Sequence, residues 1–416
     1  MSALARRLAS APDWAWLALA FLLRAGFALA LGGRLIQIDE GAFRDLALSL
    51  VRTGAIGPPG TVIAPLPTWF NAAFLLVGPA PVLPRLGQAA LSTATAWLLG
   101  RAARELTGSP SAGRLTLALS AVYPFFIYYS GTLMSETLYL ACLTGGLLQL
   151  YRSLLGGPEG RLRAAALAGL WLGLSALARA EGAYIWAVIW ALSTALCAAR
   201  RWPWKAWVAA VACWALPILG WSARNQAEAG RFALDTHGGI TLLCGTMFFE
   251  LNEIDTRHAF DALHRAPFWR EAERLPPAEQ DRFLQAKAFE FMRENPRRVL
   301  RQWAAKAVNF WRFYPRTDKP YEETATSRPS AGLGRKALVA ISLLFEPALI
   351  LFGLAGLAAL ARRRVELLGL PLFVLGTMGV HLLSVSQMRY RLPVMPLLIL
   401  GACALAGPRL DRTLEG

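Results

Sequence analysis

Long apolar segments alternate with short polar ones along most of this 416-residue chain. Many of them approach the roughly 20 residues with which a helix crosses about 30 Å of hydrocarbon. The ten-residue alternation typical of a membrane β-barrel strand is absent. The pattern therefore predicts an all-α integral membrane protein with ten spanning helices, near residues 13–33, 84–100, 114–129, 137–155, 164–178, 183–199, 206–222, 337–361, 366–385 and 391–407.

The loop between the first two predicted spans, residues 34–83, contains two further apolar segments. Residues 41–54 carry apolar side chains at the spacing of one helix face, with a polar opposite face. Residues 65–78 contain two prolines and Trp69 and are short for a bilayer crossing. We expect both to be interfacial helices, joined by a turn rich in glycine and proline.

The largest polar segment, residues 223–335, separates an N-terminal bundle (1–222) from C-terminal spanning helices (336–416). Within it, residues 296–313 form a predicted amphipathic helix that lies on the membrane surface or packs on the bundle. Its apolar side is expected to hold Val299, Trp303, Ala307, Phe310 and Trp311, and Arg297, Arg298, Arg301, Lys306 and Arg312 are expected mainly elsewhere.

Composition supports a membrane protein and orients it. The chain is 55% hydrophobic, and its mean hydropathy is +0.40. Its net charge of +16 lies largely in short clusters between spans, which indicates cytoplasmic loops and not a nucleic-acid surface. Both termini are then cytoplasmic, and the inside segments carry Arg6, Arg7, Arg101, Arg104, Arg114, Arg152, Arg161, Arg163, Arg200, Arg201, Lys205, Arg362, Arg363, Arg364, Arg409 and Arg412.

The five cysteines and four histidines show no disulfide framework and no metal-ligand spacing. On the predicted topology, ionisable groups from four loops meet the outer surface instead. An acidic pair follows the first span, and a carboxylate lies at the start of the fourth span. Arginines lie beside the outer ends of later spans. These residues are Asp39, Glu40, Glu136, Arg179, Glu181, Arg389 and Arg391.

Several segments resemble a known family. Asp39-Glu40 after an apolar helix, Glu136 after YPFFIYYSGTLMS, LARAEG at 177–182, residues 221–246, MRENPRRVLRQWAAKAVNFWRF and RYRLPVMPLLILGA occur in the order seen in GT-C-type glycosyltransferases. This polytopic family uses polyprenyl-phosphate sugars and includes protein O-mannosyltransferases and the lipid A aminoarabinose transferase. The resemblance implies a GT-C-type bundle whose first outer loop carries a catalytic carboxylate and whose small periplasmic segment covers the site.

The resemblance also implies roles for the carboxylates. Asp39 is the candidate general base, Glu40 a supporting or orienting group, and Glu136 a second carboxylate that holds acceptor or donor. Partial desolvation near a membrane surface raises the pKa of a carboxyl group, which suits a general base. The competing interpretations are a solvated helix terminus for Asp39 and helix capping for Glu136.

Arginine suits the donor phosphate because its planar fork binds two oxygens at once. Arg179, Arg224, Arg389 and Arg391 are the candidates, with snorkelling at the interface as the alternative. Arg24, in mid-span, should face the protein interior or an aqueous cavity; it, Glu181 and His237 are expected supporting residues. Some family members have Lys or His before the proline of the first outer loop, where this chain has Ala64.

These expectations describe an enzyme of the bacterial inner membrane that moves a hexosyl or pentosyl group. The donor is a polyprenyl-phosphate-linked sugar, and the acceptor is a hydroxyl of a glycan, lipid or protein. No cofactor is required, and Asp39, Glu40 and Glu136 make a thin oxygen set for a divalent metal. The alternatives are a flippase or transporter of lipid-linked saccharide, which would be expected to show paired repeats or broken helices, and an oligosaccharide ligase or polymerase on a similar fold.

Overall fold

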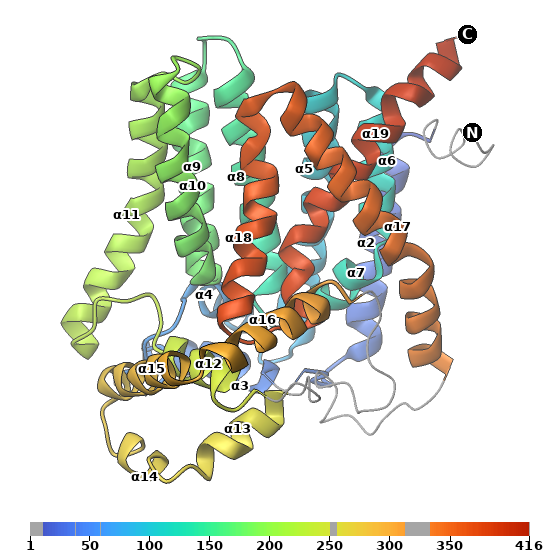
Figure 1. Cartoon of the computed structure of the whole chain (residues 1–416). Helices are drawn as coiled ribbons and strands as arrows, with labels where there is room; N and C mark the ends of the chain where they lie inside the picture. Colours follow the sequence, from blue (N-terminus) through green and yellow to red (C-terminus); the bar gives the residue numbers. More distant parts are fainter. Residues whose placement is uncertain (1–10, 38, 59, 250–255, 313–332, 416) are drawn as a thin grey trace.

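The structure is a computed structural model that describes residues 11–37, 39–58, 60–249, 256–312 and 333–415. Every regular element in these ranges is helical (Figure 1). The first half of the chain forms α2 (Asp13–Leu31), α3 (Glu40–Thr53), α4 (Leu66–Leu75), α5 (Val82–Thr107), α6 (Pro110–Val122), α7 (Pro124–Ser130), α8 (Glu136–Leu155), α9 (Arg161–Ala178), α10 (Glu181–Ala198) and α11 (Trp204–Ala229).

The second half begins with a group of helices outside the bundle and ends with three long ones. These elements are α12 (Gly238–Thr246), α13 (Thr256–His264), α14 (Trp269–Ala272), α15 (Pro277–Glu294), α16 (Pro296–Phe310), α17 (Leu333–Arg363), η2 (Val365–Leu368), α18 (Gly369–Leu383), η3 (Met388–Val394) and α19 (Met395–Glu415). The predicted all-helical, multi-pass membrane protein is therefore confirmed.

Eight helices in the described ranges are long and apolar enough to span a membrane, and they match eight of the ten predicted spans. α5 is long enough but is more polar than the others. The span predicted at 114–129 is divided into α6 and α7. Tyr123 is extended at this break, and Pro124, which has no N–H, begins the new helix.

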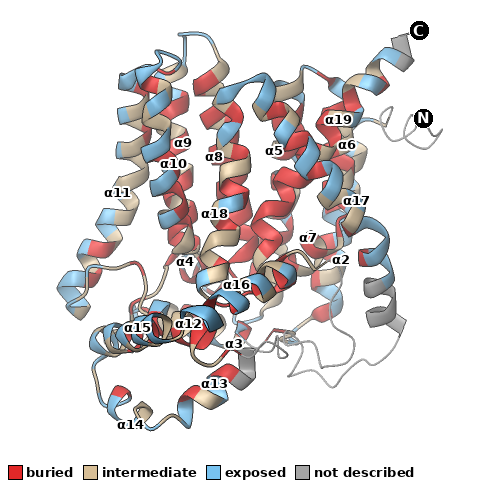
Figure 2. Ribbon diagram, in the orientation of Figure 1, coloured by how far each residue is buried: buried red, intermediate tan, exposed pale blue. Residues whose placement is uncertain are grey.

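Burial separates central from peripheral helices (Figure 2). In the most apolar part of α8, 83% of residues are buried inside the protein, against 17% for α11. α8 is therefore surrounded by protein, whereas most of α11 faces outward. Because α8 begins at Glu136, the most enclosed helix of the bundle starts with one of the predicted site carboxylates.

The predicted helices of the first outer loop are present as α3 and α4. They lie at the same end of the bundle as α12 to α16, and α16 runs across that end (Figure 1). The start of α2 and the end of α19 lie at the opposite end. Residues 313–332 of the predicted outer segment lie outside the described residues.

The buried face of α16 differs from the prediction. Val299 and Phe310 are buried as expected, but Gln302, Lys306 and Asn309 are buried beside them. Trp303 and Ala307 are only half-buried. The face is rotated because these polar side chains bind backbone carbonyls of neighbouring segments, so α16 packs on the bundle with a partly polar contact.

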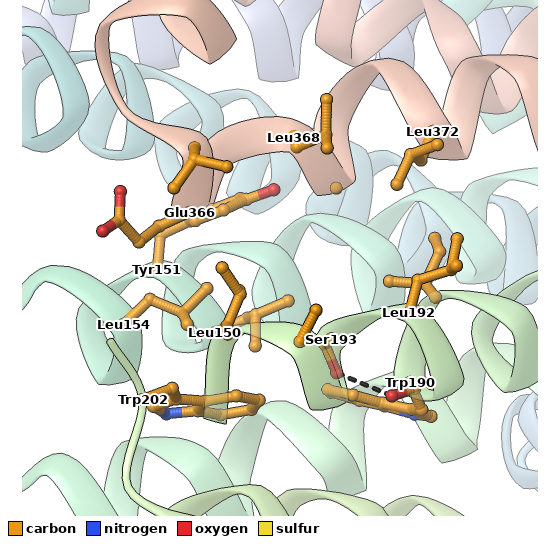
Figure 3. A pocket seen from close by; sticks show the side chains of 15 residues that line it. Leu150, Tyr151, Leu154, Trp190, Leu192, Ser193, Trp202, Glu366, Leu368 and Leu372 are labelled. Atoms are coloured by element: carbon orange, nitrogen blue, oxygen red, sulfur yellow. Dashed lines mark hydrogen bonds between the residues drawn. The ribbon is translucent and has the colours of Figure 1, made fainter. Parts of the chain in front are cut away.

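A cavity of about 130 Å³ lies between α8, α10 and the η2–α18 junction (Figure 3). Its walls are mainly leucine and tryptophan side chains, among them Trp190 and Trp202. Glu366 is its one carboxylate and is bound by Arg201 at 2.8 Å. None of the predicted site residues lines this cavity.

Candidate active site

A buried ion pair fixes the first outer loop to the bundle. Glu40, at the start of α3, is fully buried and lies 2.9 Å from a guanidinium nitrogen of Arg85 in α5, which is also fully buried. The other Glu40 oxygen accepts hydrogen bonds from the backbone N–H groups of Ile36 and Gln37, at 2.6 and 2.8 Å. Both oxygens of Glu40 are therefore occupied within the protein, and its orienting role stays a prediction.

The same pair holds the segment that leads into α8. The backbone N–H of Leu133 donates to Glu40 at 3.1 Å, and the Leu133 carbonyl accepts from the Asn71 amide at 2.9 Å. The Gln88 amide donates to the Thr132 carbonyl at 2.6 Å. Three helices (α3, α4 and α5) thus fix the backbone just before Glu136, because each contributes a buried polar side chain to it.

Asp39 immediately precedes Glu40 but points into a different environment. Its side chain is 50% exposed, and its carboxylate lies 3.3 Å from Arg389 in η3. Arg389 is partly buried, and its guanidinium also donates to the Tyr390 hydroxyl at 3.2 Å. The acidic pair of the sequence is therefore divided: Glu40 is enclosed, and Asp39 is accessible.

Tyr390 joins two of the predicted arginines. The guanidinium of Arg389 lies 5.1 Å from the centre of its ring, and that of Arg179 lies 5.7 Å from it. The ring also stacks on the imidazole of His381, with centroids 4.4 Å apart and planes within 5°. Both distances from an arginine to the Tyr390 ring are within cation–π range. One aromatic ring thus links cations from the α9–α10 connection and from η3.

Arg179 in turn joins two carboxylates. It donates to Glu136 at 3.2 Å and to Glu181 at 3.0 Å. The second oxygen of Glu181 faces Nε2 of His381 at 3.2 Å, while Nδ1 of His381 faces the Val385 carbonyl at 3.1 Å. The chain of contacts from Asp39 to Glu181 therefore runs through Arg389, Tyr390 and Arg179 without interruption.

We call the residues of this chain (Asp39, Glu136, Arg179, Glu181, His381, Arg389 and Tyr390) the carboxylate–arginine cluster. Asp235, between α11 and α12, lies within electrostatic range of it. Burial raises the pKa of Asp235, and the negative charges of Asp281 and Glu181 raise it further, against the lowering effect of His237. Sequence reasoning missed both Asp235 and Tyr390.

The α16 helix holds the loop that carries Arg389 and Tyr390. The Lys306 ammonium donates to the Leu382 carbonyl at 2.9 Å, and the Asn309 amide donates to the Ser386 carbonyl at 2.5 Å. The Ser386 hydroxyl donates back to the Lys306 carbonyl at 3.0 Å. Two residues of one helix face thus fix both ends of residues 382–386.

Besides Glu40, four of the predicted site residues lie outside the cluster. Arg391 is buried, lies 2.6 Å from Glu346 in α17 and donates to the Phe310 carbonyl. The fully buried Arg24 donates to the Ser92 hydroxyl and to backbone carbonyls, so it joins α2, α5 and α6. The remaining two are Arg224, paired with Glu228, and His237, which precedes α12 and is exposed.

These positions correct the predicted grouping of arginines. Arg391 and Arg389 are two positions apart on a tight 3₁₀ turn, so their side chains leave it in different directions. Arg391 therefore holds α17 and α16 together, and only Arg389 reaches Asp39. Within the side chains that the structure describes, no group of three or more His, Cys, Asp or Glu is placed to bind a metal; metal independence stays a prediction.

A solved structure shares this fold. The chain matches an archaeal oligosaccharyltransferase, AglB from Archaeoglobus fulgidus in complex with an inhibitory peptide and a dolichol-phosphate, with a TM-score of 0.50 and 13% identity. The match covers 97% of this chain but only 51% of AglB, so the chain spans about half of that protein's length. The fold is that of the GT-C-type membrane glycosyltransferases.

The aminoarabinose transferase ArnT from Cupriavidus metallidurans is also similar. Its apo form gives 15% identity over 95% of this chain and 77% of ArnT, with a TM-score of 0.42. Its form bound to undecaprenyl phosphate gives 15% identity over 95% of this chain and 78% of ArnT, with a TM-score of 0.44. No protein-family model and no curated protein matches the sequence. The predicted GT-C fold is confirmed by the likeness to AglB, which is a likeness of structure and not of sequence.

The different environments of the acidic pair predict different effects on stability. Glu40→Gln leaves the charge of Arg85 buried without a counter-charge, and we expect a loss of about 3–5 kcal/mol. Asp39→Asn removes a half-exposed ion pair, and we expect a change within about 1 kcal/mol. Thermal unfolding of the two purified variants in detergent measures the difference. A comparable loss of stability in both would contradict the division described here.

A second prediction concerns Lys306. Burial lowers its pKa from 10.5 to about 7. Between these values the unfolded chain retains a proton that the folded chain has released, so stability gains a component that rises with pH. This component is at most about 1.4 kcal/mol per pH unit.

We expect Lys306→Met to remove this component, which is measured as a smaller rise in unfolding temperature between about pH 7 and pH 10 than in the wild type. Lys287→Met, on the exposed face of α15, is the control and should keep the wild-type slope. Parallel pH profiles of wild type and Lys306→Met would show that the amine is not desolvated as described.

Proposed function

We propose that this protein is a glycosyltransferase that moves a sugar from a polyprenyl-phosphate donor to an acceptor hydroxyl. The reaction takes place at the carboxylate–arginine cluster, on the periplasmic side of a bacterial inner membrane. The observation that carries the proposal is the unbroken chain of contacts from the accessible carboxylate of Asp39 to the enclosed carboxylate of Glu136. A carboxylate that can act as the base and two cations thus lie at one end of the bundle, which supports the proposal.

The fold supports the choice of donor. AglB, whose fold this chain shares, was solved with a dolichol-phosphate, a lipid phosphate of the polyprenyl class. A lipid phosphate rests where hydrocarbon meets the headgroups, which is the depth expected for the ends of spanning helices. Arg179 lies directly between the ends of α9 and α10, and Arg389 lies in η3 just before α19.

The chemistry assigns a separate task to each part of the cluster. The acceptor oxygen attacks the anomeric carbon and gives its proton to Asp39. The bond between this carbon and the phosphate oxygen breaks, and the oxygen keeps the electron pair as the lipid phosphate leaves. Arg389 and Arg179 compensate the leaving charge, because guanidinium groups bind phosphate oxygens well. Single displacement from the opposite face inverts the anomeric centre.

Two buried polar atoms next to Arg179 are suited to sugar hydroxyls. One oxygen of Glu136 and the hydroxyl of Tyr139, one helical turn further along α8, are buried without a hydrogen-bond partner in the described structure. An unsatisfied buried polar atom costs about 1–3 kcal/mol, which a bound hydroxyl would recover. This arrangement supports a role for Glu136 in holding the donor sugar or the acceptor.

The direct test is Asp39→Asn in membranes or detergent, supplied with a polyprenyl-phosphate sugar and an acceptor. We expect sugar transfer to fall by about 10²–10⁴-fold, because a general base contributes that range. Thermal stability should stay close to that of the wild type. Asp45→Asn, also exposed and in α3, is the matched control and should keep full activity. Full transfer by Asp39→Asn would contradict the assignment of the base.

The same assay separates the alternatives. A flippase would move the lipid-linked sugar across sealed vesicles without forming a glycosidic bond, and Asp39→Asn would not change any bond-forming step. An oligosaccharide ligase or polymerase would extend the acceptor by more than one sugar. The proposed enzyme adds a single residue and releases one polyprenyl phosphate for each sugar transferred.

A further inference from the structure

A second cavity, away from the candidate active site, lies between α17 and α19 and has a volume of about 90 Å³. We infer that this groove binds an anionic glycerophospholipid, with an acyl chain against its floor and the phosphate among three arginines. The groove is at the end of the bundle where α17 and α19 finish, opposite α3 and α16 (Figure 1). The inference does not depend on the proposed enzymatic reaction.

Close glycine contacts explain why a groove forms here. A Cβ on Gly356 would lie 1.9 Å from the Gly401 carbonyl oxygen, and a Cβ on Gly401 would lie 2.4 Å from the Gly353 carbonyl oxygen. The backbones of α17 and α19 therefore touch where the helices cross (Figure 1). Beyond the crossing a wedge remains between residues 356–363 and 404–412, and that wedge is the cavity.

The groove joins an apolar floor to a cationic rim. Leu360, Leu405 and Pro408 are among its apolar walls, and Arg363, Arg409 and Arg412 line it as well. Arg363 is the last residue of α17, and the other two arginines are three positions apart on α19, so they lie on one face. Apolar floor and cationic rim together match the two parts of a phospholipid.

Among the described side chains, none of the three groove arginines has a carboxylate partner. Within the part of the chain that the structure describes, the one side-chain hydrogen bond that they donate runs from Arg412 to the Pro408 carbonyl, at 3.3 Å. Asp411 lies between Arg409 and Arg412 in sequence, but it accepts hydrogen bonds from Ser109 and Ser111 at the start of α6.

Several other arginines at this end of the bundle are paired. Arg104 binds Asp13 at 3.1 Å, Arg152 binds Glu105 at 2.6 Å, and Arg201 binds Glu366 at 2.8 Å. Carboxylates therefore neutralise some arginines at this end of the bundle, whereas the three that line the groove have no such partner among the described side chains. A cationic groove between spanning helices is the arrangement that anionic lipid headgroups occupy.

Charge and shape together select the ligand. A phosphodiester can accept bidentate hydrogen bonds from a guanidinium. A free phosphate would leave the apolar floor uncovered. A zwitterionic lipid would bring an ammonium group close to three cations, which disfavours it. An anionic headgroup with an acyl chain satisfies both parts of the groove.

The test uses the full chain, purified and delipidated in detergent, with dioleoylphosphatidylglycerol as the probe. Native mass spectrometry measures its dissociation constant. Dioleoylphosphatidylethanolamine and inorganic phosphate are measured in parallel. Both are expected to bind at least about tenfold more weakly, because the first brings an ammonium group close to the arginines and the second leaves the apolar floor uncovered. We expect Arg363→Gln/Arg409→Gln to weaken phosphatidylglycerol binding by about 25-fold, or about fivefold for each arginine.

Two further variants keep the result interpretable. Arg362→Gln/Arg364→Gln removes the same charge from residues next to Arg363 that do not line the groove, and its affinity should stay within about twofold of wild type. Ala359→Phe fills the groove, keeps all three arginines and should weaken binding. Equal losses in the two arginine pairs, equal binding of the ethanolamine lipid, or wild-type binding by Ala359→Phe would overturn the inference.

Discussion

The buried ion pair between Glu40 and Arg85 is the constraint on which the candidate site depends. It is fully enclosed, and its carboxylate also accepts three backbone N–H groups from two separate loops. A buried charge is tolerated only when it is paired and hydrogen-bonded, so these loops have little freedom to move apart. Asp39, one residue before Glu40, and Glu136, three residues after Leu133, are thereby held at the same end of the bundle.

A second constraint acts from the C-terminal half of the chain. Tyr390 lies between Arg389 and Arg179, and the loop before it is held by Lys306 and Asn309 of α16. The small apolar core of α12 to α15 includes Val385 and contacts Tyr390. The helices outside the bundle therefore do more than cover the site, because they position the arginine that meets Asp39.

Much of this arrangement could be predicted from the sequence. The length of the apolar segments predicted the spanning helices. The clustering of basic residues in the loops on one side of the membrane grouped Asp39, Glu136, Arg179 and Arg389 at the other end of the bundle. Sequence could not give the direction in which each side chain points. Arg391 was therefore grouped with Arg389, although it binds Glu346. Lys306 was expected away from the apolar side of α16, although it is buried.

The missed residues share a physical cause. Arg85 and Gln88 lie in α5, a helix that the sequence predicts to span the membrane. Their spacing of three positions puts them on one helix face, and this spacing could have indicated a buried polar face. Tyr390 and Asp235 become important only through residues far away in the chain. Such contacts depend on how α16, η3 and the segment before α12 pack, which periodicity alone does not determine.

The most direct measurement is an experimental structure of the protein with a non-cleavable polyprenyl-phosphate sugar bound. We expect the donor phosphate within about 3 Å of guanidinium nitrogens of Arg389 or Arg179, with the anomeric carbon turned toward Asp39. A phosphate bound instead at Arg224, or at the end of the bundle where α19 finishes, with Asp39 facing only solvent, would contradict this expectation.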